Sequence, residues 1–242
     1  MRSIMKLISK WLFSNLLPSN LQDYIRGYHR SAVLKFHIKR LIQTPENYIN
    51  LESDASRALM DRIIYGWGNP DWSADSRYLQ ACAAAALKSN SNILECGSGI
   101  TTLVMAAVTQ SSSIQLLALE HVSQWAERLD SVLRDFGFTN CKVLHVPLTN
   151  YQKFDWYDKR KFDNGSYSLV VCDGPPGSTK GGRYGLLPIM HKQLQKGSTI
   201  LLDDCQRADE TKILEQWSSE YQLDYKISGT DKKYADITFL GQ

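Results

Sequence analysis

Two glycines and a carboxylate stand together where a short apolar run ends. Glu95 closes the run, and Gly97 and Gly99 follow with a single residue between them. A helix-forming run, 103–108, comes next, so the pattern predicts a strand, a tight turn and a helix. One glycine would permit a turn that a Cβ atom blocks, and the other would let a ligand approach bare backbone. The stretch predicts a nucleotide-type cradle at the carboxyl end of a strand, beside a helix N-terminus.

The residue types around the glycines distinguish between nucleotide ligands. A dinucleotide-binding G-x-G-x-x-G motif needs a third glycine, and Thr102 stands in its place, which disfavours an NAD-type enzyme. An acid before the first glycine suits a cationic ligand, and the stretch 95–99 resembles motif I, E/D-x-G-x-G, of the class I S-adenosylmethionine-dependent methyltransferases. The resemblance implies that Glu95 lies near the sulfonium and amino-acid end of that cofactor. The binding loop that it implies contains Gly97, Ser98, Gly99, Thr101 and Thr102.

A second carboxylate, Glu120, follows the apolar run 114–119. One carboxylate can accept hydrogen bonds from both hydroxyls of a ribose, and the resemblance implies that Glu120 binds the cofactor ribose. The alternative is that Glu120 only caps the next helix. His121 would border the adenine, although a lone histidine is more often structural. No acid or amide follows the next strand directly, so the adenine contacts would come from backbone or from Asn150.

Three further carboxylates stand at the ends of two later strands. Asp173 ends one strand, and Asp203 and Asp204 end the next. Carboxylates placed together repel one another unless a cation or protons intervene, and a hard divalent ion is one remedy. The stretch 196–204 resembles the fifth strand of catechol O-methyltransferase and its relatives, with Asp204 in place of their asparagine. This resemblance implies Mg²⁺ ligation by Asp173, Asp203 and Asp204, and Asp173 is also expected to contact the cofactor.

The residue that would remove a proton from the acceptor is less well defined. The catechol family's lysine base is absent, because Pro176 stands at its place. The candidate bases are Asp173, Asp204, His191 and Lys180. The aspartates also have a structural alternative, in which they cap the next helix or pair with Arg183 or Arg207. We expect segment 178–184 to be a mobile loop that closes over the acceptor, where Lys180 and Arg183 would favour an acidic group.

Alternating strands and helices position these residues. The pattern predicts five β/α units and a terminal hairpin, which make an α/β, Rossmann-like, mostly parallel seven-stranded sheet. The resemblance implies the strand order 3-2-1-4-5-7-6 and covers residues 74–242. We therefore expect a domain over 73–242, after a basic helical extension and aromatic loop over 1–72. The expected strands after the first are 114–119, 142–146, 166–172, 198–202, 224–228 and 235–240, and the expected helices include 73–88, 123–136, 185–195 and 209–221.

The extension differs from the rest of the chain in charge. Residues 1–43 hold eight Lys/Arg and one acid, a net charge of +7, while the remainder holds 20 basic and 24 acidic residues, a net charge of −4. Residues 1–17 place apolar side chains at helical spacing, and a second basic segment covers 21–42. One interpretation is a helix on an anionic membrane surface. The other is a helix packed on the domain or on a second subunit. The aromatic loop 65–72 would either wall a substrate pocket or plug the core.

Composition bounds the class of protein. An apolar content of 43% and a charged content of 22% over 242 residues are ordinary for a soluble globular protein. The five cysteines form no C-x-x-C pair, which argues against a zinc site and a disulfide framework. We expect a reducing compartment, most simply the cytoplasm, with neither a transmembrane helix nor a signal peptide.

Together these features predict an S-adenosylmethionine-dependent O-methyltransferase, with Mg²⁺ as a second cofactor if the aspartates bind metal. A small-molecule or saccharide hydroxyl is the expected acceptor. Nucleic acid is not favoured, because the segment 173–177 lacks the [D/N]-P-P-[Y/F] motif and no Pro-Cys pair is present. The alternative is a non-catalytic scaffold that engages a membrane or an anionic polymer through the basic arm, alone or as a homo-oligomer. Acids at three strand ends favour the enzyme.

Overall fold

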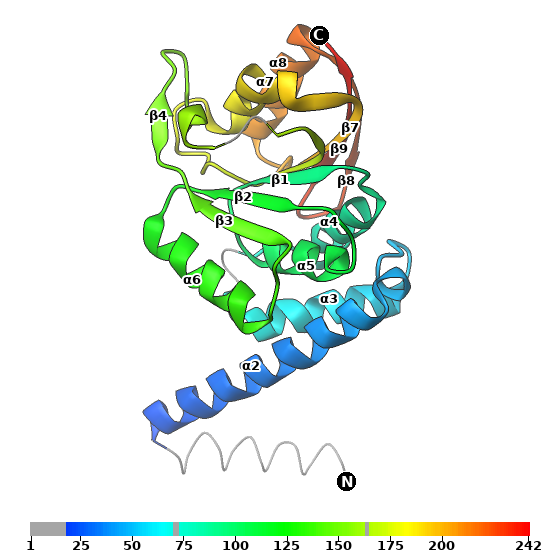
Figure 1. Cartoon of the computed structure of the whole chain (residues 1–242), viewed down its shortest axis with the longest axis vertical. Helices are drawn as coiled ribbons and strands as arrows, with labels where there is room; N and C mark the ends of the chain where they lie inside the picture. Colours follow the sequence, from blue (N-terminus) through cyan, green and yellow to red (C-terminus); the bar gives the residue numbers. More distant parts are fainter. Residues whose placement is uncertain (1–17, 70–72, 163–164) are drawn as a thin grey trace.

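The computed structural model describes residues 18–69, 73–162 and 165–242, so the expectations for residues 1–17 and 70–72 lie outside the described residues. A seven-stranded sheet of order β3-β2-β1-β6-β7-β9-β8 forms its centre (Figure 1). Its strands are β1 (Asn92–Cys96), β2 (Leu116–Glu120), β3 (Cys141–His145), β6 (Tyr167–Cys172), β7 (Leu194–Leu202), β8 (Gln222–Ser228) and β9 (Tyr234–Gly241). Only β9 pairs antiparallel, with β7 and β8. Counted along the chain, this is the predicted order 3-2-1-4-5-7-6, and that prediction is confirmed.

Helices cover both faces of the sheet. One face carries α4 (Ser76–Lys88), α5 (Ile100–Thr109) and α6 (Ser123–Asp135), and the other carries α7 (Leu186–Met190) and α8 (Ala208–Glu220) (Figure 1). Each set of helices contributes to its own apolar cluster with the sheet between them. Because both faces are covered, the central strands are apolar throughout and their polar residues gather at the strand ends.

Two elements differ from the sequence predictions. The connection after β3 forms a small antiparallel hairpin, β4 (Leu148–Asn150) and β5 (Asp155–Tyr157), whose strands are too short for a period-2 pattern to predict. The helix predicted over 185–195 is broken into a 3-10 turn (Gly182–Gly185), α7 and a second 3-10 turn (His191–Gln193). Pro188 lies in the first turn of α7, where its ring prevents the helix from extending further back.

The N-terminal extension shares the core of the domain. It contains α2 (Ser19–Gln43), a 3-10 turn (Pro45–Tyr48) and α3 (Asp54–Trp67). Ser53 caps α3, since its Oγ accepts a hydrogen bond from the N–H of Ser56 at 3.3 Å. Leu34, Ile38 and Leu41 of α2 are buried in the cluster that also contains α3, α4 and α5. The second half of α2 is thus packed on the domain, whereas its Ser19 end extends away from it (Figure 1).

Two expectations drawn from composition can be compared with the described residues. All five cysteines are free thiols there, and four of them are buried. None of the helices in these ranges is long and apolar enough to cross a bilayer.

Candidate active site at the strand ends

The turn between β1 and α5 gives its two glycines different surroundings. Gly97 has φ +83°, and a Cβ atom there would lie 3.0 Å from the backbone nitrogen of Gly174. Gly99 has an extended backbone, φ 179°, and no atom lies within 4 Å of where its Cβ would be. Gly97 is therefore required by the turn and its close packing, whereas Gly99 faces open space beside the N-terminus of α5.

Glu95 lies beneath this turn. Its side chain is fully buried, and its two carboxyl oxygens accept hydrogen bonds from the hydroxyls of Thr101 and Thr102. The Thr102 hydroxyl in turn accepts from the N–H of Gly99 at 2.9 Å. Burial raises the pKa of Glu95 to about 8, against the opposing effect of the two threonine hydrogen bonds. Through these hydrogen bonds the buried side chain of Glu95 holds the turn in its shape.

Glu120 connects the turn after β1 to the turn after β2. Its Oε2 accepts hydrogen bonds from the N–H of Ser98 at 3.2 Å and from the Ser98 hydroxyl at 2.9 Å. Its Oε1 accepts from the N–H of Val122 at 2.9 Å and lies 3.2 Å from Nδ1 of His121. The structure thus brings Glu120, Ser98 and His121 together, as the sequence predicts.

Two tryptophans lie against the turn that contains Ser98. The indole N–H of Trp125 donates a hydrogen bond to the carbonyl of Ser98 at 2.8 Å. Trp67, at the end of α3, meets Trp125 edge to face with ring centroids 6.2 Å apart. The described part of the aromatic loop therefore packs on the core and also reaches the edge of the cradle, so both of its interpretations stay open.

The aspartates at the ends of β6 and β7 surround a buried guanidinium. Arg183 is 2% exposed and donates to Oδ1 of Asp173 and Oδ2 of Asp204, both at 2.8 Å. It also donates to the carbonyl of Asp203 at 2.7 Å, and Nη1 lies 3.6 Å from Glu210. Arg207 contacts the same Asp204 oxygen at 2.7 Å but is 54% exposed. Pairing with Arg183 and Arg207, the structural alternative for these aspartates, is present.

Protons as well as arginines reduce the repulsion between these acids. Burial raises the pKa of Asp173 to about 6, although the Arg183 guanidinium opposes the shift and a third of the side chain is exposed. Burial, with the charges of Asp173 and Asp204, also raises the pKa of Asp203 well above its ordinary value. At neutral pH the cluster therefore holds fewer negative charges than its sequence implies.

The aspartate cluster has the spacing of a divalent-cation site. One oxygen from each of Asp173, Asp203 and Asp204 can be chosen so that all three lie within 4.8 Å of one another. Three clustered carboxylate oxygens fit a hard cation such as Mg²⁺ in chemistry and spacing. Arg183 already donates to two of the three side chains, so a cation would share them with the guanidinium.

Two candidate bases lie elsewhere. His191 precedes β7, at the opposite end of that strand from Asp203, and its Nδ1 lies 3.0 Å from the carbonyl of Leu187. Lys180 donates to the carbonyl of Gln152 at 2.7 Å, on the hairpin side of the loop. The structure brings neither side chain to the aspartates, because α7 and the hairpin hold them.

The segment 178–184 is packed, not open, in this structure. The N–H of Asp155 donates to the carbonyl of Lys180 at 2.9 Å, and a Cβ on Gly181 would lie 2.6 Å from Cβ of Phe154. The buried side chain of Arg183 points into the acid cluster and not toward an acceptor. The expectation that Arg183 meets an acidic group on the acceptor is therefore wrong, because its charge is used internally.

Sequence reasoning missed two residues of the site. Tyr157 is fully buried, and a Cβ on Gly174 would lie 2.6 Å from its hydroxyl and 2.9 Å from Gly97 Cα. Tyr157 thus packs where the turns after β1 and β6 meet. Glu210 is also buried, beside Arg183. Glu210 gave no signal in the sequence, because an acid in the first turn of a helix is normally explained as a capping preference. For Tyr157 the only signal was the aromatic pair 156–157 in the long connection after β3.

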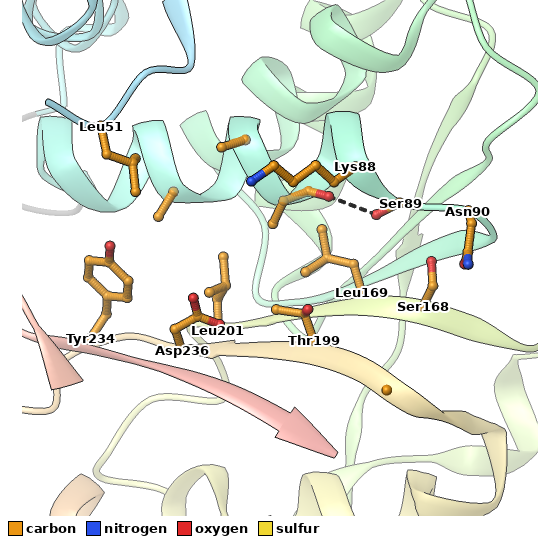
Figure 2. Close-up of a pocket in the computed structure, with 14 residues that line it drawn as sticks. Leu51, Lys88, Ser89, Asn90, Ser168, Leu169, Thr199, Leu201, Tyr234 and Asp236 are labelled. Atoms are coloured by element: carbon orange, nitrogen blue, oxygen red, sulfur yellow. Dashed lines mark hydrogen bonds between the residues drawn. The ribbon is translucent and has the colours of Figure 1, made fainter. Parts of the chain in front are cut away.

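A separate cavity of about 290 Å³ lies away from these strand ends. It lies between α4 and the strands β6, β7 and β9, with Lys88 and Asp236 among its lining residues (Figure 2). Ser168 and Gly197, near the beginnings of β6 and β7, also line it. Since Asp173 and Asp203 follow the other ends of these strands, the cavity is not part of the candidate active site.

Known structures share this arrangement of strands and helices. A methyltransferase of Podospora anserina bound to S-adenosylhomocysteine is similar with a TM-score of 0.56 and 15% identity, over 92% of this chain and 97% of that chain. The O-methyltransferase TomG of Streptomyces achromogenes, in complex with S-adenosylmethionine, has a TM-score of 0.53 and 14% identity, over 78% and 92%. A precorrin-6y C5,15-methyltransferase of Geobacter metallireducens has a TM-score of 0.54 and 12% identity, over 72% and 92%.

These similarities define the class of fold. The chain has the Rossmann-like fold of the class I S-adenosylmethionine-dependent methyltransferases. At such identities the likeness concerns the fold alone, and the named neighbours do not share one acceptor. No known family profile matches the sequence, and no curated protein sequence matches it. The fold alone therefore does not define the acceptor of this protein.

Proposed function

We propose that this protein is an S-adenosylmethionine-dependent methyltransferase that methylates a hydroxyl oxygen of a small-molecule or saccharide acceptor. The observation that carries the proposal is the open backbone at Gly99 beside Glu120, with Asp173 at the end of the adjoining strand. The methyltransferase fold supports S-adenosylmethionine as the cofactor. The O-methyltransferase TomG among the similar structures supports oxygen as the acceptor atom.

The cofactor would lie over the turns after β1 and β2. At Gly97 and Gly99 the cofactor would contact the backbone directly, because no side chain intervenes. The Glu120 carboxylate would accept hydrogen bonds from its ribose hydroxyls. When bound, S-adenosylmethionine supplies an electrophilic methyl group on a sulfonium. Glu95 keeps the turn in shape through Thr101 and Thr102, and His121 would border the adenine.

Asp173 is the general base that we favour among the four candidates. A carboxyl with a pKa of about 6 suits proton transfer near neutral pH. The Asp173 carboxylate would accept the proton of the acceptor hydroxyl as that oxygen takes the methyl group that bound S-adenosylmethionine would supply. Arg183 fixes the position of the Asp173 carboxylate through the 2.8 Å hydrogen bond to Oδ1.

Mg²⁺ offers a second way to activate the hydroxyl, in which Asp173 acts as a metal ligand instead of a base. Asp173, Asp203 and Asp204 would hold it, and a bound hard cation would lower the pKa of the acceptor hydroxyl. Arg183 supplies positive charge to the same carboxylates, so binding of S-adenosylhomocysteine, the product form of the cofactor, should not depend on the metal.

We expect S-adenosylhomocysteine to bind with the same affinity in Mg²⁺ and in EDTA. The cradle belongs to β1 and β2, whereas the aspartates end β6 and β7. Isothermal titration calorimetry of the whole chain measures this, with NAD as the control titrant. Binding that needs Mg²⁺ would show that cradle and cluster are coupled. No binding in either buffer would overturn the proposal and favour the scaffold. Transfer of labelled methyl to a panel of hydroxylated acceptors then tests the acceptor class.

A methyl group at Gly99 should block the cofactor without disturbing the fold. We expect Gly99→Ala to melt within a few degrees of wild type and to bind S-adenosylhomocysteine at least about tenfold more weakly, because its Cβ would project into the cradle. The matched variant is Gly97→Ala, which should lose stability by about 1–2 kcal/mol because a residue with a Cβ is strained at positive φ. Unchanged affinity in Gly99→Ala would place the cofactor elsewhere.

A further inference from the structure

The helix α2 exposes a large apolar face, most of it in its first half. Tyr24 is 72% exposed, Tyr28 is 73% exposed and Phe36 is 58% exposed. Leu21 and Ile25 are also exposed, and the set 21, 24, 25, 28 has the i, i+3, i+4, i+7 spacing of one helical stripe. We call Leu21, Tyr24, Ile25, Tyr28 and Phe36 the tyrosine face of α2.

The tyrosine face is not the side of α2 that holds the helix on the domain. That attachment is made by Leu34, Ile38 and Leu41 in the second half of the helix. At 100° per residue, the mean direction of Tyr24, Tyr28 and Phe36 differs from the mean direction of these three by about a third of a turn. Exposed aromatic side chains gathered on one stripe are uncommon on a surface that meets only water, so this face has the character of an interaction surface.

Positive charge accompanies the tyrosine face. The helix Ser19–Gln43 carries five Lys/Arg and one acid, a net charge of +4. Lys35 and Lys39 are exposed and lie on the same helical stripe as Tyr28, seven and eleven residues after it. The preceding residues 1–18 add three Lys/Arg and no acid, which gives the sequence up to Gln43 its net charge of +7. A second copy of this helix would bring like charges together, whereas a negatively charged surface would be complementary.

We propose that the tyrosine face of α2 docks onto an anionic lipid bilayer. Tyrosines are favoured at the boundary between headgroups and acyl chains, where the ring is buried and the hydroxyl stays hydrated. Lysines on the same stripe reach anionic headgroups with their long side chains. The helix would lie in the plane of the surface, consistent with the finding that no described helix can span a bilayer.

The helix α2 is connected to the candidate cofactor site through α3. His29 and Arg30 contact Tyr65 near the end of α3, through a 3.1 Å ring-nitrogen contact and a cation–π contact of 5.8 Å. Trp67, two residues further on, reaches Trp125 at the cradle. Contacts therefore run from α2 through the end of α3 to the edge of the candidate cofactor site. The inference does not depend on methyl transfer, because it rests on exposure and charge.

Sedimentation of the whole chain with vesicles tests the proposal. One set of vesicles contains phosphatidylcholine with about one third phosphatidylserine, and the other contains phosphatidylcholine alone. We expect binding to the anionic vesicles only, weakening as salt is raised. Tyr24→Ser/Tyr28→Ser and, separately, Lys35→Glu/Lys39→Glu should each lower the partition coefficient by at least about tenfold, because an interfacial helix binds through both buried apolar area and charge.

The matched control removes exposed apolar side chains from another place. Tyr225→Ser/Ile227→Ser on β8 alters two residues that are each 43% exposed and should leave vesicle binding unchanged. Equal binding to both kinds of vesicle, or no binding to either, would overturn the proposal. So would binding that survives both α2 double variants. A dimer seen by analytical ultracentrifugation and lost in Tyr24→Ser/Tyr28→Ser would assign the face to a second copy instead.

Discussion

Replacing Glu120 with glutamine is expected to weaken S-adenosylhomocysteine binding by about one hundredfold, since hydrogen bonds to a charged group contribute about 1.5–3 kcal/mol each. The carboxylate can accept from both ribose hydroxyls, whereas the amide offers one acceptor and one donor. Oε2 also holds Ser98 through two hydrogen bonds, so the substitution loosens the turn that carries the bare backbone. Calorimetric titration measures the affinity directly.

The control for Glu120 lies on the helix that follows it. Glu127 is exposed on α6, and its carboxylate accepts a hydrogen bond from Ser123 at 3.3 Å. Glu127→Gln changes the net charge by the same amount and should alter the affinity less than about twofold, because exposed charges are screened. Equal weakening in both variants would indicate a general charge effect. Unchanged affinity in a folded Glu120→Gln would show that this residue does not bind the ribose.

The sequence was sufficient to predict the sheet because the sheet depends on local patterns. Apolar runs that end in Glu120, Asp173 or Asp203 mark parallel strands buried on both faces, and the glycine-containing turn at 229–232 marks the antiparallel pair. The sequence also predicted that one of Gly97 and Gly99 permits the turn and the other exposes backbone, and the structure assigns the turn to Gly97. These features repeat at short range, so neighbouring residues are enough to recognise them.

The centre of the acid cluster was harder to predict because it depends on long-range contacts. Arg183 lies in a glycine-rich segment that resembles a mobile loop in sequence, yet its side chain is buried between Asp173 and Asp204. The carboxylate pattern alone fits a metal site and an arginine site equally well. Only the packing of Phe154 against the segment, from a hairpin that the sequence does not predict, decides that the arginine points inward.

Arg183 should be the most sensitive position of the site to substitution. We expect Arg183→Met to lower the free energy of unfolding by about 3–5 kcal/mol, the usual cost of removing one partner from a buried charge network. Methionine keeps the apolar length of the side chain, so the loss reports the guanidinium and not a large cavity. Urea unfolding followed by tryptophan fluorescence measures the change.

Arg207 provides a close comparison for Arg183. Its guanidinium contacts the same Asp204 oxygen and lies 3.9 Å from Glu210, but half of the side chain is exposed. Arg207→Met should therefore lower stability by less than about 1 kcal/mol, as for exposed ion pairs. Equal losses in the two variants would mean that burial does not set the role of Arg183, and no loss in either would mean that the cluster needs no fixed cation.

The loss in Arg183→Met should also depend on pH in a defined direction. Burial already raises the pKa of Asp173 to about 6, and Arg183 is the largest influence that opposes this rise. Without the guanidinium, the pKa of Asp173 lies higher still. A carboxyl whose pKa is raised by folding stabilises the fold below its unfolded value, near 4, and this contribution is lost as pH rises through the folded value. The deficit of Arg183→Met relative to wild type should therefore be smaller at pH 5 than at pH 8. A deficit independent of pH would show that Arg183 acts through packing, and the aspartates would then need a different cation.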